Sequence, residues 1–192
     1  VSIGYTLAPR INAAGRMGQA NLAAELLLTQ DPGRAAALAQ ELCALNRERQ
    51  TIECDIFQEC VQRLEQQPQS GIILLSDDHW HQGVVGIVAS RLTEKYSCPA
   101  FMVCLDHGMG KGSCRSWGGV NLFQLLTQCQ DLLEGFGGHA LAAGFTVREE
   151  NIPPLARRLR QLVLEEQAGA ELPSELEMDA AVLPQGLSLE AV

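Results

Sequence analysis

The stretch Gly135-Phe-Gly-Gly-His-Ala-Leu-Ala-Ala-Gly144 organises the rest of this sequence. Four glycines and three alanines surround one histidine, His139. Glycine admits positive φ angles and lacks the Cβ atom that would keep a ligand or a neighbouring strand at a distance. A histidine in such a stretch can donate a hydrogen bond to an anion or carry a proton near neutral pH. Two interpretations are open: a tight turn between a helix and a strand, or a loop that faces an anion.

Apolar runs alternate with amphipathic segments along the chain, which predicts an α/β fold with a small mixed β-sheet flanked by helices. The expected strands span residues 72–75, 100–105, 111–117 and 142–147. The expected helices span residues 21–28, 33–66, 84–96, 121–133 and 153–167. A linker is expected at 170–173 and a further strand at 176–182.

The helix expected at 33–66 is unusually long. Asp31 and Pro32 form a helix start signal, and apolar residues then recur every three or four positions from Leu38 to Leu64. At 1.5 Å per residue this helix would span roughly 50 Å, which is more than a typical globular domain needs. The sequence therefore predicts a connector helix between two domains.

The composition is that of a globular protein, with 46% apolar and 19% charged residues among 192. No run approaches the roughly 18 apolar residues of a membrane span, and no signal peptide opens the chain. Seven cysteines form no Cys-x-x-Cys pair, which predicts reduced thiols in a cytoplasmic protein and argues against zinc. Because the chain begins with Val1 in the middle of a pattern, we expect it to be a piece of a longer protein.

The net charge of −9 argues against nucleic-acid binding, but the charges are unevenly distributed. From Glu165 onward there are seven acidic residues and no lysine or arginine. Local basic groups, rather than the total charge, decide whether a phosphate binds.

Three stretches carry residues suited to phosphate. Lys111, Ser113 and Arg115 would share one face of a strand as a phosphate clamp, or else form a solvated edge strand. Trp80-His-Gln-Gly83, with His81, opens a helix whose free N–H groups attract anions, or is a helix entry with a packed tryptophan. Arg10, Asn12 and Arg16 would face an anion, or belong to the helical edge of a domain.

Other kinds of site are not supported. The sequence has no phosphate-binding G-x-x-x-x-G-K-[ST] loop and no G-x-G-x-x-G motif opening a helix. No serine or cysteine nucleophile has a clear base beside it. Asp77-Asp-His79 offers metal-ligand types, but without further carboxylates nearby we expect no metal in this chain.

Four motifs in order resemble one known family. Pro9-Arg-Ile-Asn-Ala-Ala-Gly-Arg-Met17, Trp80-His-Gln-Gly-Val-Val-Gly-Ile-Val-Ala-Ser-Arg-Leu92, Gly112-Ser-Cys-Arg-Ser116 and Phe136-Gly-Gly-His-Ala-Leu-Ala-Ala-Gly144 are similar to those of the RecJ exonucleases, within the DHH phosphoesterase superfamily. The resemblance covers nearly the whole chain. It implies the end of a DHH domain at 1–32, a connector helix at 33–67, a DHH-associated domain at 68–168 and the start of an OB-fold region at 172–192.

The resemblance also implies an activity. Such enzymes digest single-stranded DNA from the 5′ end, using two Mn²⁺ or Mg²⁺ ions held by the DHH domain. Ser113, Arg115 and Ser116 would grip the terminal 5′-phosphate, His139 and the amides of Gly137 and Gly138 would face the scissile phosphate, and Arg10, Asn12 and Arg16 would contact the DNA. This chain alone would hold no metal and would be inactive. A single-strand-binding protein or a repair helicase would be its protein partner.

Two departures from the family pattern and two alternatives remain. Asp77 and Asp78 precede Trp80, where a phosphate path would prefer no acids, and the DHH metal ligands lie outside this sequence. The alternatives are a DHH-type phosphoesterase acting on short oligonucleotides or cyclic dinucleotides, and a non-catalytic module that binds single-stranded nucleic acid.

Overall fold

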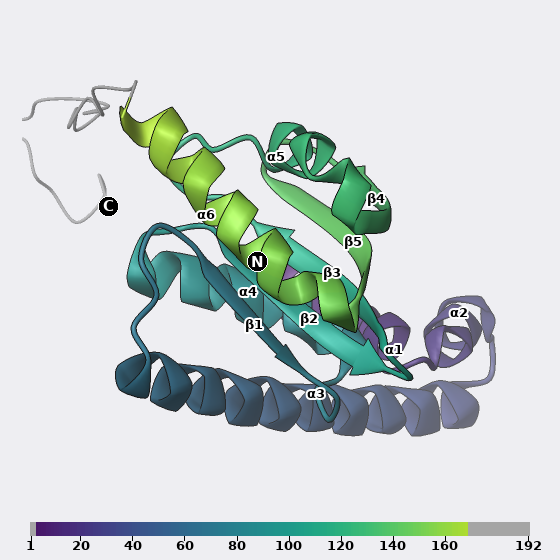
Figure 1. Cartoon of the computed structure of the whole chain (residues 1–192). Helices are drawn as coiled ribbons and strands as arrows, with labels where there is room; N and C mark the ends of the chain where they lie inside the picture. Colours follow the sequence, from purple (N-terminus) through teal and green to yellow (C-terminus); the bar gives the residue numbers. More distant parts are fainter. Residues whose placement is uncertain (1–2, 169–192) are drawn as a thin grey trace, which may run out of the picture.

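A computed structural model describes residues 3–168 as helices packed on both sides of one β-sheet (Figure 1). The helices are α1 (Ala8–Arg16), α2 (Ala20–Leu28), α3 (Pro32–Gln66), α4 (Gln82–Tyr96), α5 (Leu122–Gln128) and α6 (Ile152–Ala168). The strands are β1 (Ile73–Asp77), β2 (Ala100–Asp106), β3 (Met109–Arg115), β4 (Leu133–Gly138) and β5 (Ala142–Arg148). The predicted α/β class is therefore confirmed, whereas the linker at 170–173 and the strand at 176–182 lie outside the described residues.

The sheet is mixed, in the order β1-β2-β3-β5-β4. β1 and β2 are parallel and are joined by α4, because parallel neighbours need a crossover connection. The other pairs are antiparallel. One face packs on α3 and α4 through residues such as Met102 and Val88, and the other packs on α5 and α6 through residues such as Phe101 and Leu159. Figure 1 shows α6 crossing in front of the sheet and α4 behind it.

The long helix α3 takes part in two separate hydrophobic cores. Its start is capped by Asp31, whose side chain accepts a hydrogen bond from the Gly33 amide at 2.8 Å. Leu42 and Leu45 pack with α1 and α2, whereas Ile56, Cys60 and Leu64 pack with β1, β2 and α4. One helix thus holds a small N-terminal helical unit and the sheet in a fixed relation.

The glycine-rich stretch is not the loop that the sequence predicts. Residues 133–138 form β4, an edge strand paired with β5, so the stretch is a β-hairpin with His139 at its turn. The helix predicted at 121–133 ends at Gln128, because the chain must turn into this strand at Leu133. Gly138 has φ +139°, and a Cβ atom there would lie 2.5 Å from the Ala143 Cα. Close pairing of the hairpin therefore requires glycine at position 138.

Candidate anion-binding site

A cavity of about 550 Å³ lies between α1, α4 and β3. Three segments that are far apart in the sequence meet there. α1 contributes Asn12 and Arg16, the first turns of α4 contribute Gln82, Gly83 and Gly86, and β3 contributes Ser113 and Arg115. No carboxylate lines this cavity, although acidic residues outnumber basic ones in the whole chain.

Arg115 is the central side chain of this cavity. Its Nη1 atom donates to the Ser113 hydroxyl at 3.2 Å and to the Cys114 carbonyl at 2.8 Å. Among residues 3–168 it forms no ion pair with an acidic group. Burial, and then the positive charge of Arg16, lower the pKa of Arg115 below the usual arginine value. A half-buried guanidinium without a carboxylate partner is an incomplete electrostatic arrangement that an anion would complete.

Arg16 joins α1 to the start of α4. Its Nη1 atom donates to the Gly83 carbonyl at 3.1 Å. A Cβ atom at Gly83 would lie only 2.1 Å from the Arg16 carbonyl oxygen, so glycine is needed for this approach. The backbones of the two helices touch here, which places two arginines on one cavity.

Four of the predicted phosphate-binding residues therefore meet in the structure: Asn12, Arg16, Ser113 and Arg115. Lys111 is exposed on the same face of β3 but does not line the cavity, because four residues of strand span roughly 13 Å. Ser116 lies after the strand, and its hydroxyl donates to the Val120 carbonyl.

Arg10 and His81 occupy structural positions. The Arg10 Nε atom donates to the Cys43 sulfur at 3.2 Å, which ties α1 to α3. The His81 Nδ1 atom accepts from the Gly83 amide at 3.1 Å and so caps α4. This bond occupies one of the free N–H groups that the sequence suggested for an anion. Trp80 is buried, as the packed-tryptophan alternative expected.

The hairpin residues do not line the cavity, although β5 pairs with β3 beside Arg115. His139 is exposed at the β4–β5 turn, where its amide donates to the Ala142 carbonyl at 2.9 Å. Gly137 is exposed on β4, and a Cβ atom there would meet nothing within 4 Å. Their assignment to the scissile phosphate stays a prediction.

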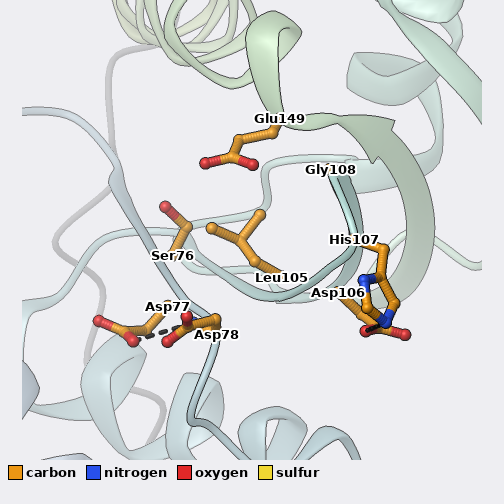
Figure 2. A pocket seen from close by; sticks show the side chains of 8 residues that line it. All are labelled: Ser76, Asp77, Asp78, Leu105, Asp106, His107, Gly108 and Glu149. Atoms are coloured by element: carbon orange, nitrogen blue, oxygen red, sulfur yellow. Dashed lines mark hydrogen bonds and ion pairs between the residues drawn. The ribbon is translucent and has the colours of Figure 1, made fainter.

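A second cavity, of about 520 Å³, has the opposite charge. Asp77, Asp78, Asp106 and Glu149 line it together with His107 (Figure 2). In the register of β2 and β3, Asp106 and Arg115 lie at opposite ends of the pair. The acids that depart from the family pattern therefore belong to a different cavity from Arg115.

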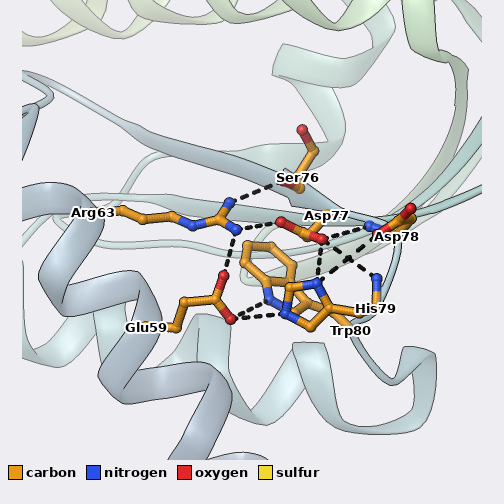
Figure 3. Close-up of polar contacts among 7 residues, drawn as sticks. All are labelled: Glu59, Arg63, Ser76, Asp77, Asp78, His79 and Trp80. Atoms are coloured by element: carbon orange, nitrogen blue, oxygen red, sulfur yellow. Dashed lines mark hydrogen bonds and ion pairs between the residues drawn. The ribbon is translucent and has the colours of Figure 1, made fainter.

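Asp77 also belongs to a network that joins α3 to the end of β1 (Figure 3). The Arg63 guanidinium forms ion pairs with both Glu59 and Asp77. Glu59 also accepts hydrogen bonds from the His79 Nε2 atom at 2.9 Å and from the Trp80 indole at 3.1 Å. The sequence does not predict this network, because Glu59 is distant from His79 in the chain. The four-residue spacing of Glu59 and Arg63 indicates only an ion pair along one face of a helix.

The pKa values in the network reflect these contacts. Partial burial opposes ionisation of Asp77, but the Arg63 guanidinium and the His79 amide outweigh it and lower its pKa to about 2. The hydrogen bond to Glu59 and the charge of Asp77 raise the pKa of His79. All of these charges are compensated within the network.

The network brings together ligand types for a metal but does not fit one well. Possible ligand atoms of Glu59, Asp77 and His79 lie within 4.8 Å of one another. From the sequence we assumed that no further carboxylate lies near His79, and Glu59 shows that this assumption is wrong. However, the Arg63 guanidinium already occupies both carboxylates. A cation would have to displace another cation, so the contacts favour a structural tie.

None of the helices described here is both long and apolar enough to cross a membrane. All seven cysteines are free, and four of them are buried.

The fold and the cavity define an α/β domain with an arginine-lined cavity, attached through a long helix to a second helical core. Residues 58–165 match the family model of the DHHA1 domain, and the chain belongs to that family. This match and the relatives below confirm the resemblance that the four motifs indicated.

The relatives are longer proteins. The chain is 42% identical over 164 residues to the single-stranded-DNA-specific exonuclease RecJ of Bacillus subtilis, which covers 84% of this chain and 21% of that protein. It is 36% identical over 199 residues to RecJ of Escherichia coli, which covers 98% of this chain and 34% of that protein. The chain thus spans between a fifth and about a third of these two relatives.

Solved structures are similar as well. RecJ from Thermus thermophilus in complex with Mg²⁺ matches with a TM-score of 0.78 and 39% identity, covering 85% of this chain and 26% of that one. An exonuclease RecJ bound to manganese matches with a TM-score of 0.76 and 38% identity, covering 89% of this chain and 44% of that one.

Proposed function

We propose that this chain is the substrate-holding part of a single-stranded-DNA-specific 5′→3′ exonuclease, and that the cavity between α1, α4 and β3 receives the terminal 5′-phosphate. The single observation that carries the proposal is the half-buried Arg115, which has no carboxylate partner in the described chain and faces a second arginine. A phosphate monoester supplies the missing negative charge and accepts hydrogen bonds from arginine and serine together.

Four residues would hold the phosphate. Arg115 and Arg16 would neutralise its charge, Ser113 would donate its hydroxyl, and Asn12 would donate its side-chain amide. A terminal phosphate carries more negative charge than an internal phosphodiester, so two arginines in one cavity favour a strand end over the middle of a strand.

Hydrolysis itself would require groups outside the cavity. The cavity offers no carboxylate or imidazole to a divalent cation, and the ligand types near His79 are already paired with Arg63. The similar structures in complex with Mg²⁺ or manganese support metal-dependent hydrolysis in the parent protein. We place the metal ligands in the part of the relatives that this chain does not span.

The remaining assignments are proposals of the same kind. The two cores along α3 support a division into the end of a DHH domain, a connector helix and a DHH-associated domain. Seven free cysteines suit a reducing compartment such as the cytoplasm. A single-strand-binding protein or a helicase as partner rests on the family resemblance alone.

The test is the affinity of the 192-residue chain for two oligonucleotides that differ only at the 5′ end, one with a phosphate and one with a hydroxyl. The unchanged chain should bind the phosphorylated strand more tightly. Arg115→Ala should weaken this binding about tenfold or more, because a hydrogen-bonded charge contact is removed. Its effect on the hydroxyl strand should be much smaller.

Arg157→Ala is the matched control, because Arg157 is exposed on α6, on the other side of the sheet from α4. It removes the same charge but should leave the ratio of the two affinities unchanged. Equal losses for both strands in Arg115→Ala would rule out a 5′-phosphate site.

A further inference from the structure

Helix α4 passes so close to β3 that one of its residues faces Ser113 and Arg115. We call these two side chains the clamp. An added Cβ atom at Gly86 would lie 2.8 Å from the Ser113 Oγ atom and 3.1 Å from the Arg115 Nη2 atom. The carbon–oxygen distance is shorter than real Cβ atoms show, and the carbon–nitrogen distance is tighter than almost all of them, so both contacts would be repulsive. Glycine is therefore the only residue type at position 86 that leaves these two side chains where they lie.

We propose that Gly86 is a positioning residue that sets the preference of this site for a terminal phosphate. Because Gly86 has no side chain, the Arg115 guanidinium and the Ser113 hydroxyl have the room to align on one anion. The inference rests on the proposed function, because it assigns Gly86 a role in that same cavity.

The hydrogen bonds of Arg115 explain why its position is sensitive. Nη1 holds Ser113 and the Cys114 carbonyl, whereas Nη2 turns toward α4 and makes no hydrogen bond within the described chain. Nη2 and Nε are therefore the donors left for a ligand, and Nη2 is the one that lies beside Gly86. A methyl group at position 86 would press on this donor and on the hydroxyl that orients the guanidinium.

The atoms that would have to yield are the ends of side chains. Ser113 and Arg115 can rotate away from a new methyl group without moving the backbone of β3. Alanine is also a better helix former than glycine, which offsets part of the crowding. The cost of Gly86→Ala should therefore appear in ligand binding and not in folding.

Gly83, one turn earlier in α4, provides a contrast. A Cβ atom there would meet the backbone carbonyl of Arg16 at 2.1 Å, and a backbone atom cannot rotate away. Substitution at Gly83 would separate α1 from α4 and change the whole cavity. The two glycines of one helix thus have different tasks: Gly83 permits the helices to dock, and Gly86 permits the clamp to align.

The experiment measures Gly86→Ala in the 192-residue chain with the same pair of oligonucleotides, together with its thermal unfolding midpoint. We expect the preference for the 5′-phosphate to fall about tenfold, as expected for the loss of a charge-assisted hydrogen bond, with an unchanged or higher midpoint. In an Arg115→Ala background, Gly86→Ala should cause no further loss, because the donor that it displaces is already gone. Gly4→Ala is the control, since a Cβ atom at that exposed position meets nothing within 4 Å.

The outcomes separate this inference from the proposed function. If the unchanged chain prefers the phosphorylated strand and Gly86→Ala keeps that preference, Gly86 has no positioning role and the clamp stands. A clearly lowered unfolding midpoint, or failure to fold, would show that glycine serves packing and would overturn the inference. If the unchanged chain has no preference, both the clamp and the role of Gly86 are wrong.

Discussion

Arg115 shows what a single residue contributes to the proposed site. Its alternation with Ser113 along β3 is visible in the sequence, and the structure confirms that both line one cavity. Its burial, its lack of an acidic partner among the described residues and its proximity to Arg16 depend on the packing of α1 and α4. The sequence could therefore indicate the residue types of a phosphate site. It could not tell that Asn12 and Arg16 line the same cavity as Arg115 while Arg10 and Ser116 do not.

Gly112 provides a residue-scale prediction about stability. It lies on β3 with its Cα facing the Phe145 ring, and an added Cβ atom would lie 2.2 Å from the Phe145 Cζ atom. Phe145 packs against Phe101 within the core, so the ring has little freedom to move. Gly112→Ala should lower the free energy of unfolding by about 1–3 kcal/mol, the usual cost of overpacking.

Denaturant-induced unfolding measures this effect. Gly135→Ala is the control, because position 135 is exposed on β4 and an added Cβ atom there would have no neighbour within 4 Å. That variant should stay within about 0.5 kcal/mol of the unchanged chain. If both variants are equally stable, the close approach of Phe145 to β3 is not real.

At the scale of elements, the helices were more predictable than the hairpin. The long helix was recognisable because its apolar residues recur over many turns and Asp31-Pro32 marks its start. The sequence does not predict β4, because its glycines are typical of a turn and because its pairing with β5 is a tertiary contact. The same pairing shortens the helix predicted at 121–133.

The tie between α3 and β1 is an element-scale feature with a dependence on pH. His79 bonds to Glu59 on α3 and to Asp77 at the end of β1. Because its pKa is raised in the folded chain, protonated His79 contributes stability that is fully present below about pH 6.5. That contribution is lost as the pH rises through the raised value.

His79→Gln should therefore reduce the free energy of unfolding more at about pH 6 than at about pH 9, as measured by urea unfolding at both values. His107→Gln is the control, because His107 is almost fully exposed and its ion pair is with Asp106 and not with a residue of α3. It should show a smaller dependence on pH. A His79→Gln effect that is constant or grows with pH would contradict the proposed tie.

At the scale of the whole molecule, charge is segregated despite the net value of −9. Four acids gather in the cavity lined by Asp77 and Glu149, and two arginines gather in the cavity lined by Arg16 and Arg115. A nucleic acid would be repelled from one end of the β2–β3 pair and attracted to the arginine cavity. The total charge therefore does not decide whether a nucleic acid binds, and the substrate class is proposed from the family resemblance.

The division of labour with the parent protein gives a further prediction. The pure 192-residue chain should show no nuclease activity with Mn²⁺ on 5′-phosphorylated single strands, because its anion cavity has no metal ligands. Release of mononucleotides is the measurement, and the chain with Arg115→Ala should be equally inactive. Metal-dependent digestion by the unchanged chain, lost in a variant at Glu59 or His79, would overturn this division.

The most direct test of the central claim is a crystal structure of this chain with a 5′-phosphorylated oligonucleotide. We predict the terminal phosphate between α1, α4 and β3, with Arg115 and Ser113 donating to its oxygens and Arg16 close by. A terminal phosphate bound elsewhere, with the arginine cavity empty, would contradict the proposed site.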